Sequence, residues 1–192
     1  MAKRVPGERR REILQTLAEM LESPKGEKIT TALLAKKLDV SEAALYRHFA
    51  SKAQMFEGLI EFIEQTVFSL VNKIQSDEPD PMKQVEATVA TLLGFAQKNP
   101  GMTRVLIGDA LVNEDERLQA RVSQLLDRLE ASLRQSARLA VTAGALPADW
   151  DVNAYANAVI AFVVGRWHQF AKSGFKRAPM EGWPQQWRIF AA

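Results

Sequence analysis

The chain has 192 residues, of which 47% are hydrophobic and 25% are charged, a globular composition that argues against a disordered chain. It contains no cysteine, so it has no disulfide framework and no thiolate metal site, and a reducing cytoplasm suits it. The basic N-terminus is not followed by an apolar core of signal-peptide length. The longest apolar run, around 158–165, is far shorter than the roughly 18 residues of a membrane span. We therefore expect a soluble, intracellular protein.

Apolar residues recur at helical spacing along almost the whole chain. A first helix is predicted over about 8–22, and two short ones follow within 30–50. A long fourth helix is capped by Ser51 and reaches about residue 75. Further helices are predicted over 82–98, 102–107, 114–142 and 152–172, between stops that contain Pro or Gly. With no convincing period-2 strand and no repeat, the sequence predicts an all-α fold of about nine helices.

Residues 30–50 have the pattern of a helix-turn-helix, in which one helix braces a second against the major groove of DNA. Ser41 begins the second helix as an N-cap, and Leu45 and Phe49, four residues apart, share its inward face. The other side carries small or polar residues suited to an anionic surface: Ala43, Ala44, Tyr46, Arg47 and His48. In the first helix of the motif, Leu33, Leu34 and Leu38 are expected to face inward, with Lys36 and Lys37 outward.

The basic residues are concentrated in the same part of the chain. Residues 1–52 hold 11 Lys and Arg against 7 Asp and Glu, whereas the remaining 140 residues hold 14 against 16. This uneven distribution is typical of a protein that contacts phosphates, although a charge excess of this size also decorates ordinary surfaces.

The predicted fourth helix has a core stripe and an aromatic residue beside it. The stripe is expected to comprise Met55, Leu59, Ile63, Val67, Leu70 and Ile74. Phe62 lies roughly 90° from the centre of that stripe at about 100° per residue, and Phe68 lies nearly opposite. Phe62 is therefore either a filler at the edge of the core or an anchor for a partner.

The last two long helices are joined by a short connection and are expected to pack antiparallel. Small residues lie on or near one face of the second of them: Ala154, Ala158, Ala161 and Gly165. Two such pairs of helices from two subunits would form a four-helix bundle, although both helices could instead fill the core of one subunit. We favour a homodimer, because a single helix-turn-helix reads only a short half-site and a two-fold dimer doubles it.

The Leu-Tyr-Arg-His-Phe segment at 45–49, followed by Ser51 and Lys52, resembles the TetR family of bacterial DNA-binding regulators. A narrower similarity to the nucleoid-occlusion subfamily rests on SEAALYRHF, LIEFIE, LLGFAQKNPG and LVNEDERLQARVSQLLDRLEA, and it fades after about Arg138. The resemblance implies a DNA-binding domain over 1–52 and a helical domain for dimerisation and partner binding over 53–192. One departure is Asp39, which stands in the turn where many members have Gly, and Asp is among the better substitutes in left-handed backbone.

Members of that subfamily bind palindromic chromosomal sites and engage the division GTPase FtsZ, preventing ring assembly over unsegregated DNA. The resemblance therefore implies a cytoplasmic, nucleoid-associated adaptor with two partners. It also implies FtsZ-binding roles for Phe62 in LIEFIE and for Gly94, Lys98 and Asn99 in LLGFAQKNPG. Without the resemblance, Asn99-Pro100-Gly101 is a helix stop and Gly94 a packing point.

Roles on DNA follow from the chemistry of each side chain in the motif. Tyr46 and His48 are expected to donate to phosphates, and Ala43 and Ala44 to lie against thymine methyl groups. Arg47 can reach a guanine edge, or it can pair with Glu42. The remaining expected contacts are with phosphate, and for the arginines also with the minor groove: Arg9, Arg10, Arg11, Thr30, Thr31, Ser41 and Lys52. Lys52 is included because a cation in the first turn of a helix opposes the macrodipole, so a nearby anion would stabilise it.

Other functional classes have less support. The chain has only two histidines, His48 and His168, and it lacks a Gly-rich phosphate loop, an HExxH motif or a nucleophile motif, so we expect no enzyme and no cofactor. The acidic residues Asp109 and 114–116 are read as a solvated helix start rather than a metal site. The alternative function is a ligand-responsive repressor with a pocket lined by Trp150, Phe162 and Trp167, although such aromatics are more often core.

Overall fold

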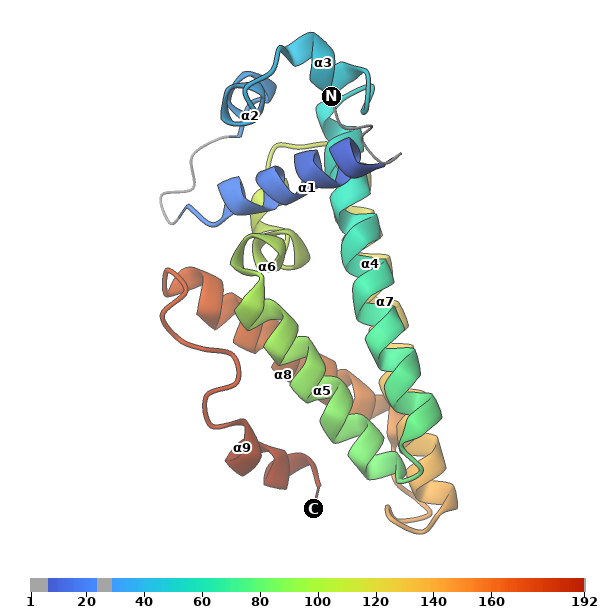
Figure 1. Ribbon diagram of the computed structural model, residues 1–192. Helices are drawn as coiled ribbons and strands as arrows, with labels where there is room; N and C mark the ends of the chain where they lie inside the picture. Colours follow the sequence, from blue (N-terminus) through green and yellow to red (C-terminus); the bar gives the residue numbers. More distant parts are fainter. Residues whose placement is uncertain (1–6, 24–28, 192) are drawn as a thin grey trace.

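The computed structural model describes residues 7–23 and 29–191, and this part of the chain is all helical, as predicted (Figure 1). Its elements are α1 (Glu8–Leu21), α2 (Thr31–Lys37), α3 (Glu42–Tyr46), α4 (Lys52–Asp77), α5 (Pro81–Lys98), α6 (Pro100–Leu106), the 3₁₀ turn η1 (Asp109–Leu111), α7 (Glu116–Thr142), α8 (Val152–Lys172) and α9 (Trp183–Phe190). None of the described helices is long and apolar enough to cross a membrane.

Several helices begin where a short polar side chain accepts a backbone N–H that has no helical partner. Thr30, Ser41 and Ser51 accept from Leu33, Ala44 and Gln54, respectively, at 3.2, 3.2 and 3.1 Å. Asp39 has a φ of 53°, so the turn between α2 and α3 does adopt the left-handed backbone expected there. These local features explain why α2, α3 and α4 begin where the sequence predicts.

Helices α1, α2 and α3 pack together at one end of a core that continues through the rest of the molecule. Leu34 and Ala35 of α2 are buried with Leu45 and Phe49, and Ile13 of α1 lies in the same cluster. The expectation for Leu33 was wrong, because its side chain is 45% exposed. Helix α2 has only seven residues, and its buried side consists of Leu34 and Ala35. Leu33 points away from that side.

The long helix α4 runs from this module to the opposite end of the molecule (Figure 1). Its buried residues include Met55, Leu59, Ile63 and Val67, as predicted, but the next is Val71, and Leu70 is 42% exposed. The buried line therefore keeps to steps of four residues.

The same core continues among α4, α5, α7 and α8. One side of α7 is buried through Leu118, Val122, Leu125, Leu129 and Leu133, whereas Leu126 is partly exposed. Trp167 of α8 is 1% exposed and its indole Nε1 donates to the Leu92 carbonyl of α5 at 3.2 Å. The small residues of α8, Ala154, Ala158, Ala161 and Gly165, are all exposed in the single chain.

Helix α9 was not located from the sequence, although Pro184 in its first turn is a known start signal. It packs through Trp183, whose ring lies 5.8 Å from that of Phe162 on α8. Arg166 holds the preceding segment by donating to the carbonyls of Ala178, Pro179 and Glu181 at 2.8–3.2 Å. A guanidinium that donates to three carbonyls can fix this loop, even though its sequence shows no regular spacing of apolar residues.

Candidate nucleic-acid interface

Helix α3 presents the outward face expected of a reading helix. Leu45 and Phe49 are each 1% exposed, which confirms the predicted inward face. Ala43 and Arg47 are exposed, and Tyr46 is 45% exposed despite its aromatic ring. The residues assigned to DNA contact are therefore accessible, with Ala44 and His48 half-buried at the margin.

A chain of hydroxyl groups connects the starts of α2 and α3. Thr31 donates from its hydroxyl to the Glu42 carboxylate at 2.5 Å, and the Tyr46 phenol lies 3.4 Å from the same Thr31 oxygen. Glu42 is thus held by Thr31, and no ion pair with Arg47 is found within the described residues. Thr30 and Ser41 use their hydroxyls as N-caps, so both stabilise the motif directly.

The three arginines of α1 differ in what they contact. Arg10 donates to the His48 carbonyl at 2.6 Å, and its guanidinium lies 4.2 Å from the centroid of the Phe49 ring. Arg9 pairs with Glu12 at 2.5 Å, and Arg11 is exposed. Arg10 therefore ties α1 to the end of α3, a structural role that sequence reasoning did not anticipate.

A cation in the first turn of a helix is expected to have an anion nearby, and Lys52 does have one. That anion is a carboxylate of the protein itself. The ammonium group is paired with Glu114, which precedes α7, and lies 5.6 Å from the centroid of the Phe56 ring. Both side chains are largely buried, at 24% and 16% exposure. Contact between Lys52 and phosphate stays a prediction, and it now requires competition with Glu114.

Three of the acidic residues near the start of α7 have basic partners: Asp109, Glu114 and Asp115. Asp109 accepts from Arg104 and Lys172, and Glu114 from Lys52. Hydrogen bonds from Arg117, above all from its side chain, lower the pKa of Asp115 to about 2. Among the described residues no group of three or more potential ligands could hold a metal ion.

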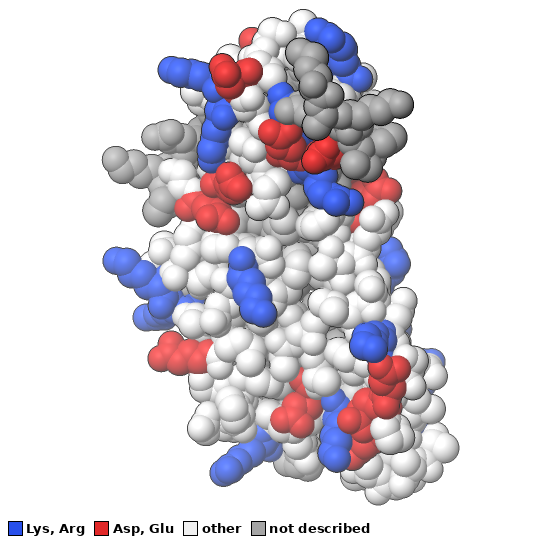
Figure 2. Space-filling model, in the orientation of Figure 1, with Lys and Arg blue, Asp and Glu red and all other residues white. Residues whose placement is uncertain are grey.

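Acidic and basic side chains are mixed over the module on the face shown in Figure 2, rather than forming one continuous basic surface. On α2, Lys36 and Lys37 are exposed as predicted, and Lys37 lies 3.7 Å from Glu19. Since several arginines and lysines are already paired, the positive charge free for phosphate contact is smaller than the sequence count suggests.

A groove of about 240 Å³ lies between α4 and α1, where α1 is the first helix of the DNA-reading module, which consists of α1, α2 and α3. Phe62 is 37% exposed and lines it, so the predicted displacement of Phe62 from the core stripe is confirmed. The wall contributed by α1 is basic and the α4 wall is mixed; the lining is Arg10, Arg11, Leu14, Gln15, Gly58, Leu59, Glu61, Phe62, Gln65 and Met102. An aromatic ring beside two arginines suits a peptide that carries apolar and acidic side chains.

The other expected partner residues lie at the end of α5, outside the lining of this groove. A Cβ added to Gly94 would meet nothing within 4 Å, so Gly94 is not a packing point. Lys98 is exposed, and the Asn99 amide donates to the Phe95 carbonyl at 2.7 Å, closing the last turn of α5. Asn99 therefore has a structural role in addition to any partner contact.

The aromatics considered for a ligand pocket have separate surroundings. Trp167 is a core residue, Phe162 packs against Trp183 and Phe190, and Trp150 is 36% exposed beside Tyr155. These contacts favour the interpretation of Trp167 and Phe162 as core rather than as the wall of a shared pocket.

Comparison with known proteins agrees with this architecture. Residues 18–59 match the model described as bacterial regulatory proteins, tetR family, and residues 80–192 match the SlmA-like model of the tetracyclin repressor-like C-terminal domain. Among solved structures, the TetR family regulator PfmR from Thermus thermophilus superimposes with a TM-score of 0.78 at 22% identity, covering 93% of this chain and 96% of that one. FadR from Bacillus halodurans gives 0.80 at 13% identity, covering 100% and 97%. The fold and the helix-turn-helix define a TetR-type DNA-binding regulator.

The proteins related in sequence identify a narrower family than the solved structures do. The chain is 50% identical to the nucleoid occlusion factor SlmA of Marinomonas sp., over 96% of this chain and 93% of that protein. It is 50% identical to SlmA of Alteromonas mediterranea, covering 95% and 93%, and 49% identical to SlmA of Shewanella oneidensis, covering 94% and 92%. The chain therefore belongs to the SlmA family of nucleoid occlusion factors.

Proposed function

We propose that this protein is a homodimer that binds palindromic chromosomal sites and, while bound, inhibits assembly of the division GTPase FtsZ over the nucleoid. The observation that carries the proposal is the proximity of two different surfaces. The exposed face of α3 suits the major groove, and Arg10 connects it with the groove beside Phe62, because Arg10 lines that groove and donates to the His48 carbonyl just after α3. A protein with these two surfaces can hold DNA and a second macromolecule at once.

The proposed dimer is supported by the exposed face of α8. Ala154, Ala158, Ala161 and Gly165 follow one another at steps of four, three and four residues, and all are exposed in the single chain. Residues at this spacing form the seam of antiparallel helix pairs, and small ones allow close approach. A two-fold dimer across this face would present two copies of α3 to two half-sites.

The proposal separates the residues by partner. The α3 face, with Tyr46 and Arg47, is assigned to DNA, whereas Phe62 and the end of α5, with Lys98, are assigned to FtsZ. The alternative, a repressor released from DNA by a small ligand, has weaker support because Trp167 packs into the core between α5 and α8. Release of the protein from its site by one particular metabolite would favour that alternative.

The test is sedimentation of FtsZ polymers formed with GTP, in the presence and absence of this protein and of a duplex selected by it from random sequences. We expect the pelleted fraction of FtsZ to fall when the protein and its duplex are both present. An unchanged pellet under all conditions would contradict the FtsZ assignment, whereas failure to select any duplex would contradict the DNA assignment.

A further inference from the structure

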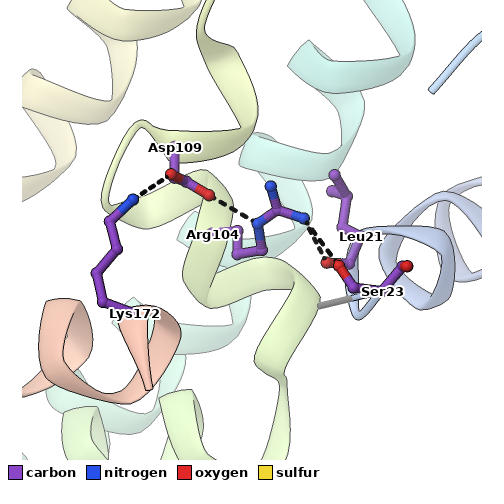
Figure 3. A network of polar contacts seen from close by, with 5 residues as sticks. All are labelled: Leu21, Ser23, Arg104, Asp109 and Lys172. Atoms are coloured by element: carbon purple, nitrogen blue, oxygen red, sulfur yellow. Dashed lines mark hydrogen bonds and ion pairs between the residues drawn. The ribbon is translucent and has the colours of Figure 1, made fainter. Parts of the chain in front are cut away.

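A polar network joins the body of the protein to the C-terminal end of α1 (Figure 3). Arg104 of α6 donates from Nε to Asp109 at 2.8 Å, and from Nη1 to the carbonyls of Leu21 and Ser23 at 3.1 and 3.4 Å. The second oxygen of Asp109 accepts from Lys172 of α8 at 2.6 Å. One arginine therefore connects α8 and η1 with the end of the first helix of the DNA-reading module.

The contact matches the chemistry of a helix end. The last carbonyls of a helix have no partner within it and carry a partial negative charge, so a cation placed there is favourable. A guanidinium is always charged and offers several donors in one plane, which lets Arg104 serve the carbonyls and the carboxylate together. Its side chain is only 16% exposed, so water competes weakly for these bonds.

The backbones of α6 and α1 also meet directly at this point. A Cβ added to Gly101 would lie 1.9 Å from the Ala18 carbonyl oxygen, so only glycine allows the contact. Helix α6 is fixed in turn, because the hydroxyl of buried Thr103 is 3.0 Å from the carbonyls of both Ala96 and Asn99. The joint between α1 and the body is therefore closely packed as well as hydrogen-bonded.

The opposite end of α1 holds the reading helix. Arg10 bonds the carbonyl of His48 and covers the ring of Phe49, directly after α3. Helix α1 thus connects the body at Arg104 with α3 at Arg10. Arg10 lies 11 residues before Leu21, or about 16.5 Å along the helix axis, so a tilt of about 10° at the Arg104 end would move Arg10 by about 2.9 Å, close to the roughly 3.4 Å rise per base pair.

We infer that Arg104 is a positioning residue that sets the half-site spacing the dimer accepts, by fixing the angle of α1 and with it the position of α3. The inference rests on the proposed homodimer on palindromic DNA. Arg104 does not touch DNA itself. Apolar packing of Ile13 and Leu17 stays when Arg104 is removed, so the module remains folded while its angle to the body becomes less defined.

The test compares wild type with Arg104→Ala on a palindrome selected by the wild type. Fluorescence anisotropy would measure binding to that duplex, to versions whose centre is shortened or lengthened by one or two base pairs, and to a single half-site. We expect wild type to prefer the selected spacing by at least about tenfold, whereas Arg104→Ala binds all spacings within about threefold of one another and keeps its half-site affinity.

Two further variants separate positioning from general stability. Asp109→Asn keeps Arg104 but removes the negative charge that fixes its guanidinium, so we expect an intermediate spacing preference. Arg121→Ala removes the 2.8 Å ion pair with Glu64, which does not involve α1, and should leave the preference unchanged.

Three results would overturn the inference: an unchanged spacing preference in Arg104→Ala, an equal loss on every duplex including the half-site, or a wild type that tolerates all spacings. Failure of wild type to bind any palindrome would instead count against the proposed function.

Discussion

Lys52, the first residue of α4, is paired with Glu114, which lies 62 residues later in the segment before α7. The pair joins the edge of the DNA-reading module, at Lys52, to the body, at Glu114, and Lys52 is a residue that we expect to contact phosphate. A carboxylate that already pairs with an ammonium group weakens the attraction of that group to a phosphate, because the two anions repel each other. DNA binding and the Lys52–Glu114 pair are therefore expected to compete.

The first prediction concerns that competition. Glu114→Gln should free Lys52 and strengthen binding to all duplexes by about two- to fivefold. The reason is that Lys52 would no longer have to give up an ion pair of up to about 1 kcal/mol in order to contact phosphate. The measurement is anisotropy on specific and random duplexes over a range of salt concentrations. Weaker binding by this variant would mean that Glu114 holds Lys52 in place for DNA rather than competing with it.

The second prediction separates a base contact from a phosphate contact. Arg47→Ala should cost about 1–3 kcal/mol on the selected site and relax discrimination at one base position, since an arginine reads guanine through a fixed pair of hydrogen bonds. Lys52→Ala should weaken binding to all sequences and lower the salt slope by about one. An equal loss with Arg47→Ala on specific and random duplexes would contradict its assignment to a base.

The third prediction compares two glycines with opposite surroundings. Gly101→Ala should lower the free energy of unfolding by about 1–3 kcal/mol or more, because its Cβ would overlap the Ala18 carbonyl. Gly94→Ala should raise it by about 0.5–1 kcal/mol, because Gly94 lies within α5 with open space at its Cβ. Urea unfolding followed by circular dichroism checks both, and a stable Gly101→Ala would contradict the close approach of α6 and α1.

Features that are determined within one helix were predicted correctly from the sequence. The N-caps Ser41 and Ser51 and the displacement of Phe62 depend on residues within a few positions of one another, and all were predicted. The bounds of α8 were predicted as well, because its apolar residues keep helical spacing between the stops on either side. Local chemistry is sufficient where a feature is determined within one helix.

The misses depend on contacts between distant segments. The exposure of Leu70 depends on which side of α4 the other helices cover. The partners of Lys52 and Arg104 lie 62 and up to 83 residues away. The chain has many acidic residues, so charge alone does not identify Glu114 as the partner of Lys52. Every residue has a backbone carbonyl, so the sequence does not indicate which carbonyls Arg104 contacts. The polar contacts between the module and the body were therefore not predictable.

The fourth prediction concerns pH and Asp109. Burial alone would raise the pKa of Asp109, but hydrogen bonds from Lys172 and Arg104 outweigh it and lower the pKa below its ordinary value. A carboxyl whose pKa is lowered by folding stabilises the protein above its unfolded-state pKa of about 3.9, and this contribution is lost as the pH falls through the lower folded-state value.

The measurement is the free energy of unfolding of wild type and Asp109→Asn between about pH 2 and pH 7. We expect wild type to be more stable by about 1–3 kcal/mol above about pH 5, with the difference shrinking as the medium becomes more acidic. A difference that does not change with pH would show that the ionised carboxylate is not what holds Arg104 and Lys172.

The central claim is that one molecule holds DNA and FtsZ at once through separate surfaces. The most direct measurement is capture of purified FtsZ on an immobilised selected duplex by wild type, Phe62→Ala and the control Ile189→Ala, which removes an apolar side chain that is 75% exposed on α9. The account predicts that all three proteins bind the duplex equally and that Phe62→Ala alone fails to retain FtsZ. Retention of FtsZ by Phe62→Ala at the wild-type level, or no retention by wild type, would contradict it.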